Sequence, residues 1–160
     1  MSFRIGHGYD LHRLQPGGQL VLGGVVVSTE ISPIAHSDGD VVIHAIVDAL
    51  CGALGAGDIG DHFPDSNPAY RGAKSTMFLE KVKGDLDAAG YHVANLDVTI
   101  LVERPRLKPF KAQIADNLGR IFGTSVNIKA GTNEGVDAIG RGEAIAAHAL
   151  VLLAKNAVEP

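Results

Sequence analysis

The segment from Val41 to Leu54 places the tightest constraint on how this chain can fold. It reads VVIHAIVDALCGAL and is the longest apolar stretch, interrupted only by His44, Asp48 and Gly52. A membrane span needs about 18 or more consecutive apolar residues, so this segment belongs inside a protein core. The spacing predicts a helix over about residues 39–53 that ends near Gly52 and Gly55, with Ser37 and Asp40 as a capping box at its start.

The polar residues of this helix form one line, because Asp40, His44 and Asp48 are four positions apart. Buried polar side chains need partners, so the line predicts contacts to other parts of the chain. His36 and Ser37 directly precede the helix, whose N-terminal N–H groups and dipole suit a phosphate. The alternative is that His44 is an ordinary hydrogen-bonded core histidine and that both aspartates only satisfy neighbouring loops.

Apolar periodicity and turn residues predict the other elements. Strands are expected over residues 3–12, 93–102 and 126–130, a hairpin over 19–22 and 25–28, and helices over 74–89 and 109–119. Loops are expected over 32–37 and 56–72, and residues 141–154 fit a helix or a buried strand. A length of 160 residues with Cys51 as the single cysteine predicts one domain, over residues 1–160, that folds without disulfides.

Charge and the first residues restrict the class of protein. Lys and Arg number 14 against 18 Asp and Glu, a net charge of −4, which argues against a dedicated nucleic-acid binder. The first ten residues, MSFRIGHGYD, resemble neither a secretory signal nor a transit peptide. We therefore expect a protein of the bacterial cytoplasm, and a mature plastid protein fits the same observations.

The strongest chemical signal lies at Asp10 and His12. Side chains two apart on a strand share a face, so this carboxylate and imidazole converge within metal-chelating distance. With His44 they would supply three ligands, and a catalytic zinc keeps its fourth position open. An Asp-x-His pair also arises by chance, so the spacing indicates a metal site without indicating a reaction.

Three further segments carry groups that could bind a ligand. The acidic loop over residues 58–65 could bind sugar hydroxyls, a hard cation or only water. The basic loop over residues 102–108 could hold a phosphate or a base, or be a solvated turn. Residues 129–135 combine glycines, a threonine and a glutamate, which is typical of a corner for a phosphate and a cation, although a bare turn fits as well.

Taken together and in order, these motifs resemble a known family. GHGYDLHRL, AHSDGDVVIHAIVDALCGALGAGDIGDHFPD, DVTI and GRGEAIAA are similar to the 2-C-methyl-D-erythritol 2,4-cyclodiphosphate synthases of the non-mevalonate isoprenoid pathway, from about residue 4 to 154. The resemblance implies an α/β (α+β) subunit with a ferredoxin-like mixed sheet, helices on one face and a strand at the C-terminal end. It also implies a homotrimer with active sites between subunits, no membrane partner, and a small cytidine diphosphate substrate that is cyclised with release of CMP.

The resemblance also assigns roles. Asp10, His12 and His44 would bind one Zn²⁺ per subunit, which aligns and polarises the β-phosphate. His36 and Thr132 would stabilise the transition state, and Glu134 would hold Mg²⁺ or Mn²⁺ on the diphosphate. Further substrate contacts are implied at Ser37, Asp58, Ile59, Gly60, Phe63, Pro64, Asp65, Ser66 and Asn67, at the cytidine-binding residues Val102, Pro105, Arg106, Leu107 and Lys108, and at Gly131, Asn133 and Arg141. Asp10 and His12 would also lie against the substrate, and Cys51 would be a packing residue.

The chain departs from the family pattern at four positions, and two other functions compete. Gly131 and Asn133 stand where many members carry Thr or Ser, Ala138 where many carry an aromatic residue, and Asn67 where Asp is common. One competing function is a metal-dependent phosphohydrolase or phosphodiesterase with water as the nucleophile. The other is a non-catalytic trimeric module with a structural zinc, for which Asp40 would be the extra ligand.

Overall fold

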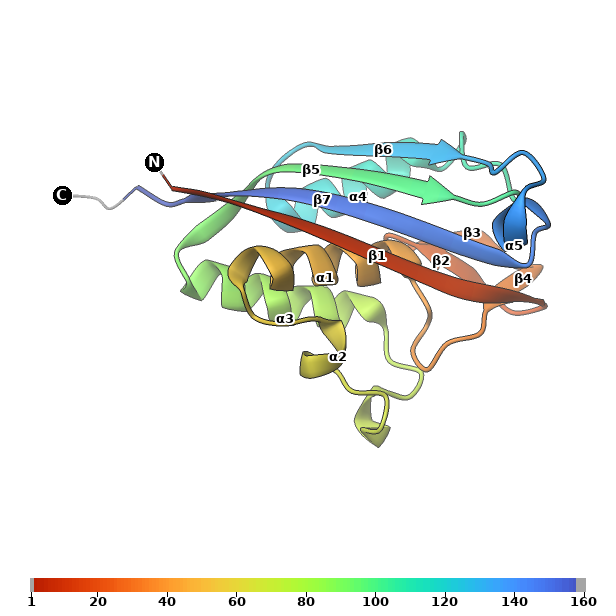
Figure 1. The fold of residues 1–160 in the computed structure, drawn as a ribbon, viewed down its shortest axis with the longest axis horizontal. Coiled ribbons are helices and arrows are strands. Elements are labelled where there is room, and N and C mark those ends of the chain that lie inside the picture. The colour runs from red at the N-terminus through yellow and green to blue at the C-terminus, as the bar shows by residue number, and fades with distance from the viewer. Residues whose placement is uncertain (1, 158–160) are drawn as a thin grey trace.

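The computed structural model describes residues 2–157 and contains a mixed five-stranded sheet (Figure 1). Its strand order is β4-β1-β7-β5-β6, and a separate hairpin pairs β2 with β3. β1 and β5 flank β7 antiparallel to it, whereas β5 and β6 are parallel. The strands are β1 (Phe3–Pro16), β2 (Leu20–Leu22), β3 (Val25–Ser28), β4 (Ile31–Pro33), β5 (Tyr91–Leu101), β6 (Val126–Gly131) and β7 (Ala144–Lys155).

Three helices, α1 (Val41–Leu54), α3 (Ser75–Ala88) and α4 (Lys111–Phe122), cover one face of this sheet. Short elements complete the chain: α2 (Ile59–His62), the 3-10 turn η1 (Pro68–Tyr70) and α5 (Asp137–Gly140). In Figure 1, α1 lies beneath β1 and β7, and α3 lies beyond α1. Within residues 2–157, no helix covers the opposite face of the sheet, so the two faces have very different surroundings.

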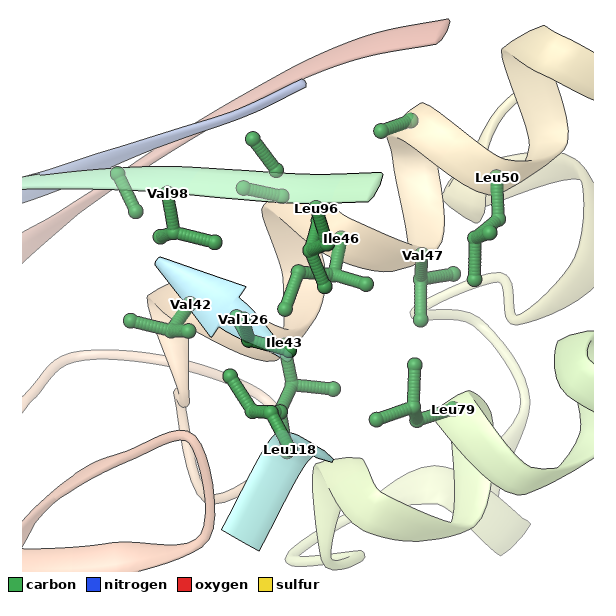
Figure 2. Packing of buried hydrophobic residues seen from close by; sticks show 14 of the residues in the cluster. Val42, Ile43, Ile46, Val47, Leu50, Leu79, Leu96, Val98, Leu118 and Val126 are labelled. Atoms are coloured by element: carbon green, nitrogen blue, oxygen red, sulfur yellow. The ribbon is translucent and has the colours of Figure 1, made fainter. Parts of the chain in front are cut away.

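The core forms around α1, in which ten of the fourteen residues are buried. Figure 2 shows Ile43 and Ile46 directed toward Leu96 of β5 and Leu118 of α4, and Val47 facing Leu79 of α3. Burying a side chain of this size contributes about 1.5–3 kcal/mol, so a helix that is apolar on nearly every side is stable only at this central place.

Close contact between α1 and β1 depends on two glycines. Gly6 and Gly8 are buried beneath the helix, and a Cβ atom at Gly8 would overlap the carbonyl oxygen of Ala45. A Cβ at Gly6 would likewise overlap the carbonyl oxygen of Ala49. Glycine is therefore required here for close backbone approach.

The predicted capping box at the start of α1 is wrong. Asp40 is the N-cap, and its Oδ1 accepts the N–H groups of Val42 (3.2 Å) and Ile43 (3.1 Å). The same carboxylate accepts the N–H groups of Gly23 (2.9 Å) and Gly24 (2.7 Å) in the β2–β3 turn. Burial raises the pKa of Asp40 to about 6, although these N–H donors oppose the shift. The prediction that N–H groups at this helix end are free for a phosphate is also wrong at Val42 and Ile43, because Asp40 occupies them.

The other expected elements are found with shifted ends. The hairpin and the helices expected over 74–89 and 109–119 are confirmed, and the strand expected over 3–12 continues to Pro16. The expected loop over 32–37 begins inside β4, and the expected loop over 56–72 contains α2 and η1. Residues 144–155 form a strand, which resolves the ambiguity at the C-terminal end, and α5 was not predicted. Within residues 2–157, every helix is too short or too polar to cross a bilayer.

Candidate functional site

A cleft of about 780 Å³ lies where the centre of β1 meets the start of α1. Ten of the predicted site residues line it, together with four that were not predicted. The predicted ones are Asp10, His12, His36, Ser37, His44, Ile59, Gly60, Phe63, Pro64 and Asp65, and the additional ones are Ile34, Ala35, Tyr70 and Phe78. The sequence patterns at the two metal motifs and at the acidic loop therefore converge on one place.

Asp10, His12 and His44 meet at one edge of this cleft, as predicted. Asp10 Oδ2 lies 3.0 Å from His12 Nε2 and 2.9 Å from His44 Nδ1, and the two nitrogens are 3.1 Å apart. Ligand atoms around a tetrahedral zinc with bonds near 2.05 Å are separated by about 3.3 Å, so this oxygen and these two nitrogens fit such an ion. Their side chains are 12–24% exposed, which leaves one side of the group open.

Hydrogen bonds from His44 to Ser75 and from Ser75 to Asp38 determine which nitrogen of His44 faces Asp10 and His12. His44 Nε2 lies 2.9 Å from Ser75 Oγ, and Ser75 Oγ is also hydrogen-bonded to Asp38. Ser75 Oγ donates its single hydroxyl proton to the carboxylate of Asp38. Ser75 therefore accepts from His44 Nε2–H, which leaves Nδ1, facing Asp10, as the atom that would bind a metal ion in place of its proton. This is the usual outer arrangement of metal-binding histidines.

The environment of Asp10 keeps its carboxylate ionised. Burial by itself would raise its pKa, but hydrogen bonds and the charges of His12 and His44 outweigh burial and hold the pKa well below its ordinary value. Ser75 and Asp38 are the outer residues that sequence reasoning missed. The signal for them was weak, because both lie near the ends of helices, where such residues are commonly caps.

His36 and Ser37 stand beside this group on the segment that leads into α1. The Nε2 atom of His36 is buried and has no hydrogen-bond partner within residues 2–157, although it borders the cleft. Ser37 Oγ lies 3.1 Å from His44 Nε2 and also accepts the N–H of Gly39. An unpaired buried nitrogen is costly, so His36 has capacity for a ligand.

The acidic loop divides into residues that face the cleft and residues that shape the loop. Asp58 caps α2 by accepting the N–H of Asp61 (3.0 Å), and Asn67 caps η1 by accepting the N–H of Ala69 (3.0 Å). Neither these two nor Ser66 lines the cleft. Phe63 packs against Phe78 with ring centroids 4.5 Å apart and against Tyr70 at 5.6 Å, which gives the cleft an aromatic wall.

A second pocket, of about 320 Å³, lies at the other edge of the sheet, between the loop after β5 and the end of β6. Its lining includes the predicted Val102, Pro105, Arg106, Leu107, Lys108, Gly131 and Thr132. It also includes Glu103 and Ala130, which lie within the predicted segments 102–108 and 129–135, and Lys111, which was not predicted. Glu103 Oε2 is buried without a hydrogen-bond partner in the described chain. The two pockets have no lining residue in common.

The remaining predicted residues lie near this second pocket or outside both pockets. Glu134 has φ of 51°, an uncommon conformation for a non-glycine residue, and borders a neighbouring depression with Thr132. Thr132 Oγ1 donates to Glu134 Oε1 over 3.2 Å. Asn133 donates to Asp137 over 2.8 Å, and Arg141 is paired with Glu143 over 3.0 Å, so both are held by neighbours in α5 or its flanking turn.

Comparison with known proteins identifies relatives along nearly the whole chain. Residues 3–154 match the YgbB family. The chloroplastic 2-C-methyl-D-erythritol 2,4-cyclodiphosphate synthase of Arabidopsis thaliana is 48% identical over 159 residues, 98% of this chain and 69% of that protein. The 2-C-methyl-D-erythritol 2,4-cyclodiphosphate synthase of Pelobacter propionicus is 50% identical over 153 residues, 94% of this chain and 97% of that protein. The structure of IspF from Plasmodium falciparum in complex with CDP aligns with a TM-score of 0.85 at 30% identity, over 98% of both chains.

Proposed function

This chain belongs to the YgbB family, and we infer that it is a cyclodiphosphate synthase of the non-mevalonate isoprenoid pathway. It converts 4-diphosphocytidyl-2-C-methyl-D-erythritol 2-phosphate to 2-C-methyl-D-erythritol 2,4-cyclodiphosphate and releases CMP. The observation that carries this inference is the convergence of Asp10, His12 and His44 at one edge of the large cleft. We propose that residues 1–160 act as a single catalytic domain.

The reaction forms one phosphorus–oxygen bond and breaks another. An oxygen of the 2-phosphate attacks the β-phosphorus, and the bond to the oxygen shared with the α-phosphate breaks, so that CMP leaves. No side-chain nucleophile is needed, and catalysis rests on positioning and on neutralising charge. Cys51 is buried and takes no part.

We propose that Asp10, His12 and His44 hold Zn²⁺, one ion per subunit. When bound, the ion supplies a Lewis acid that aligns and polarises the β-phosphate. His36 donates its unpaired Nε2–H to a phosphate oxygen, and Ser37 lies beside it. The aromatic wall and the backbone at Ile59 and Gly60 enclose the methylerythritol end.

We propose that the second pocket binds the cytidine part of the substrate. Arg106, Lys108 and Lys111 give it positive charge, which suits a nucleotide. Thr132 would stabilise the transferring phosphate, and Glu134 would bind the Mg²⁺ or Mn²⁺ that accompanies the diphosphate. The structure of the Plasmodium falciparum relative with CDP supports a cytidine nucleotide as the ligand of this fold.

The separation of the two pockets supports an active site shared between chains. They lie at opposite edges of one sheet and have no lining residue in common, so one substrate would need pockets from two copies. The uncovered face of the sheet exposes Phe3, Ile5, Tyr9, Leu11 and Leu150 by 45–69%, which is typical of a face that a partner covers. We propose the homotrimer, with its ferredoxin-like subunits, as the active form, and the cytoplasm as its expected location.

Phosphorus-31 NMR tests this function. The untagged protein is supplied with the CDP-linked substrate and Mg²⁺, before and after zinc is removed by chelation. We expect cyclic diphosphate and one CMP per turnover, both lost on chelation and restored by Zn²⁺. Asp10→Ala and His44→Ala should abolish zinc binding and turnover, whereas the control His92→Ala, an exposed histidine of β5, should change neither.

Other outcomes would indicate the competing functions. Free phosphate that carries solvent ¹⁸O, without a cyclic product, would identify a hydrolase with water as the nucleophile. Full turnover in a zinc-free variant would overturn the role of the metal. Bound zinc with no reaction would favour the non-catalytic module, although Asp40 is occupied as a helix cap and is not free to be its fourth ligand.

A further inference from the structure

Outside the proposed active site, two histidines meet on the uncovered face of the sheet. His7 of β1 and His148 of β7 are brought together diagonally, because His148 is directly opposite Tyr9 in the antiparallel ladder. His7 Nε2 lies 3.1 Å from His148 Nδ1, and the pair is exposed. The two rings are stacked at 29° with centroids 5.4 Å apart, and Tyr9 lies against His148 at 4.7 Å.

The nitrogen atoms of this pair are spaced as two ligands of one ion would be. Two imidazole nitrogens bonded to one metal at about 2.05 Å are separated by about 2.9 Å at a right angle and about 3.3 Å at the tetrahedral angle. The separation of 3.1 Å lies between these values and equals that of His12 Nε2 and His44 Nδ1 in the candidate metal centre. Among residues 2–157, neither ring makes another hydrogen bond.

The scaffold holds the pair in place before any ion binds. β1 and β7 are paired continuously from Phe3 to Arg13, so the positions of both histidines are fixed by the central ladder of the sheet. The side chains also emerge on the face opposite to Asp10 and His12, since residues of opposite parity on β1 point to opposite faces. The pair is therefore separate from the active-site ligands.

We propose that His7 and His148 chelate a second divalent transition metal ion. Imidazole ligands favour Ni²⁺, Cu²⁺ and Zn²⁺, and Mg²⁺ or Ca²⁺ would not bind here because they require oxygen ligands. The chain supplies two ligands at the histidine pair and three at Asp10, His12 and His44. The pair should therefore bind an ion more weakly and be occupied only after the three-ligand site. It lies on the face where a second copy is proposed to pack, and an ion there would tie β1 to β7 at that interface.

Metal counting on zinc-saturated, untagged protein tests the proposal. The protein is equilibrated with Ni²⁺, freed of unbound ion, and its zinc and nickel are measured by mass spectrometry. We expect the zinc content to stay constant while nickel binds at one equivalent per chain, or one per assembly if copies share it. His7→Asn and His148→Gln should each remove this nickel, and His92→Ala should retain it.

Two results would overturn the proposal. Nickel content that is unchanged in His7→Asn and His148→Gln would mean that the ion binds elsewhere. No nickel in the wild-type protein would mean that the two rings only share a hydrogen bond. Circular dichroism and the zinc content of each variant test whether it is folded, and so distinguish a loss of nickel from a loss of structure.

Discussion

The two faces of the central sheet are built from alternate residues of the same strands, and they serve different purposes. On β1, Gly6, Gly8, Asp10 and His12 face α1, whereas Ile5, Tyr9 and their odd-numbered neighbours face outward. The helix side is closely packed and carries the metal ligands at its edge. The open side exposes apolar residues and the histidine pair. A shift of β1 by one residue would exchange the two faces, so the strand register is the main determinant of function.

The largest expected effect is at the contact between β1 and α1. Gly8→Ala places a methyl group against the carbonyl oxygen of Ala45, and we expect the free energy of unfolding to fall by more than about 3 kcal/mol. Urea denaturation measures this. The matched control is Gly52→Ala, an exposed position in α1 where a Cβ meets nothing within 4 Å, and it should stabilise the protein by up to about 1 kcal/mol. Equal stability of both variants would contradict the account of this packing.

A charge on the open face should act on assembly and leave the subunit fold intact. Ile5 is 69% exposed in the single chain, and burying it between copies is worth about 1.5–3 kcal/mol. Ile5→Asp should therefore weaken association by about ten- to a hundredfold per interface, as light scattering after gel filtration would show. Val26→Asp, at another exposed apolar residue on β3, should assemble normally. An unchanged assembly for Ile5→Asp would place the interface elsewhere.

Asp40, the buried N-cap of α1, predicts a dependence of stability on pH. The pKa of Asp40 is about 6 in the folded chain and 3.8 as its ordinary value, so between these values the folded state binds more protons than the unfolded state. The free energy of unfolding should then fall as pH rises through this window, by up to about 1.4 kcal/mol per pH unit. Asp40→Asn keeps a side chain that can cap the helix but cannot ionise.

Chemical denaturation of both proteins from pH 4 to pH 7 measures this effect. The stability of the wild type relative to Asp40→Asn should be greatest at the acid end and should decrease toward neutrality. A difference between the two proteins that stays constant with pH would contradict the raised pKa of Asp40.

The smallest effect, on zinc affinity, is expected at Ser75, which contacts the metal ligand His44. Ser75→Ala removes the acceptor that fixes the tautomer of His44, but Ser37 Oγ remains 3.1 Å from the same nitrogen. We expect zinc affinity to fall about tenfold, at the low end for such outer contacts, as measured by competition with a chelator. Ser125→Ala, at an exposed serine before β6, is the control and should bind zinc as the wild type does.

Several features of the fold could be predicted from sequence because they depend on local periodicity. The apolar stretch beginning at Val41 had to be a buried helix, and the alternation around Asp10 and His12 had to place both on one face of a strand. The segment beginning at Arg141 could not be assigned from its residues alone, because alanines and branched residues there satisfy both patterns. It forms strand β7, which pairs with β1 on one side and with β5 on the other.

Contacts between distant residues were less predictable. The cap of α1 was assigned to Ser37 because its spacing fits, but Asp40 satisfies the β2–β3 turn and the helix together and therefore takes that role. His7 and His148 are 141 positions apart, and only the ladder between β1 and β7 brings them within hydrogen-bond distance. Asp38 and Ser75 are also far apart in the sequence, and the packing of α1 against α3 brings them within hydrogen-bond distance.

The sequence by itself determined which side chains share a face of a strand or helix, because that depends on backbone repeats of two and 3.6 residues. It thereby placed Asp10 with His12 and placed His44 on a mostly buried helix. The tertiary structure alone decided which faces meet, which partner satisfies each buried polar group, and that the two pockets lie at separate edges of one sheet. These depend on packing and on the register between segments far apart in the chain, which no local pattern encodes.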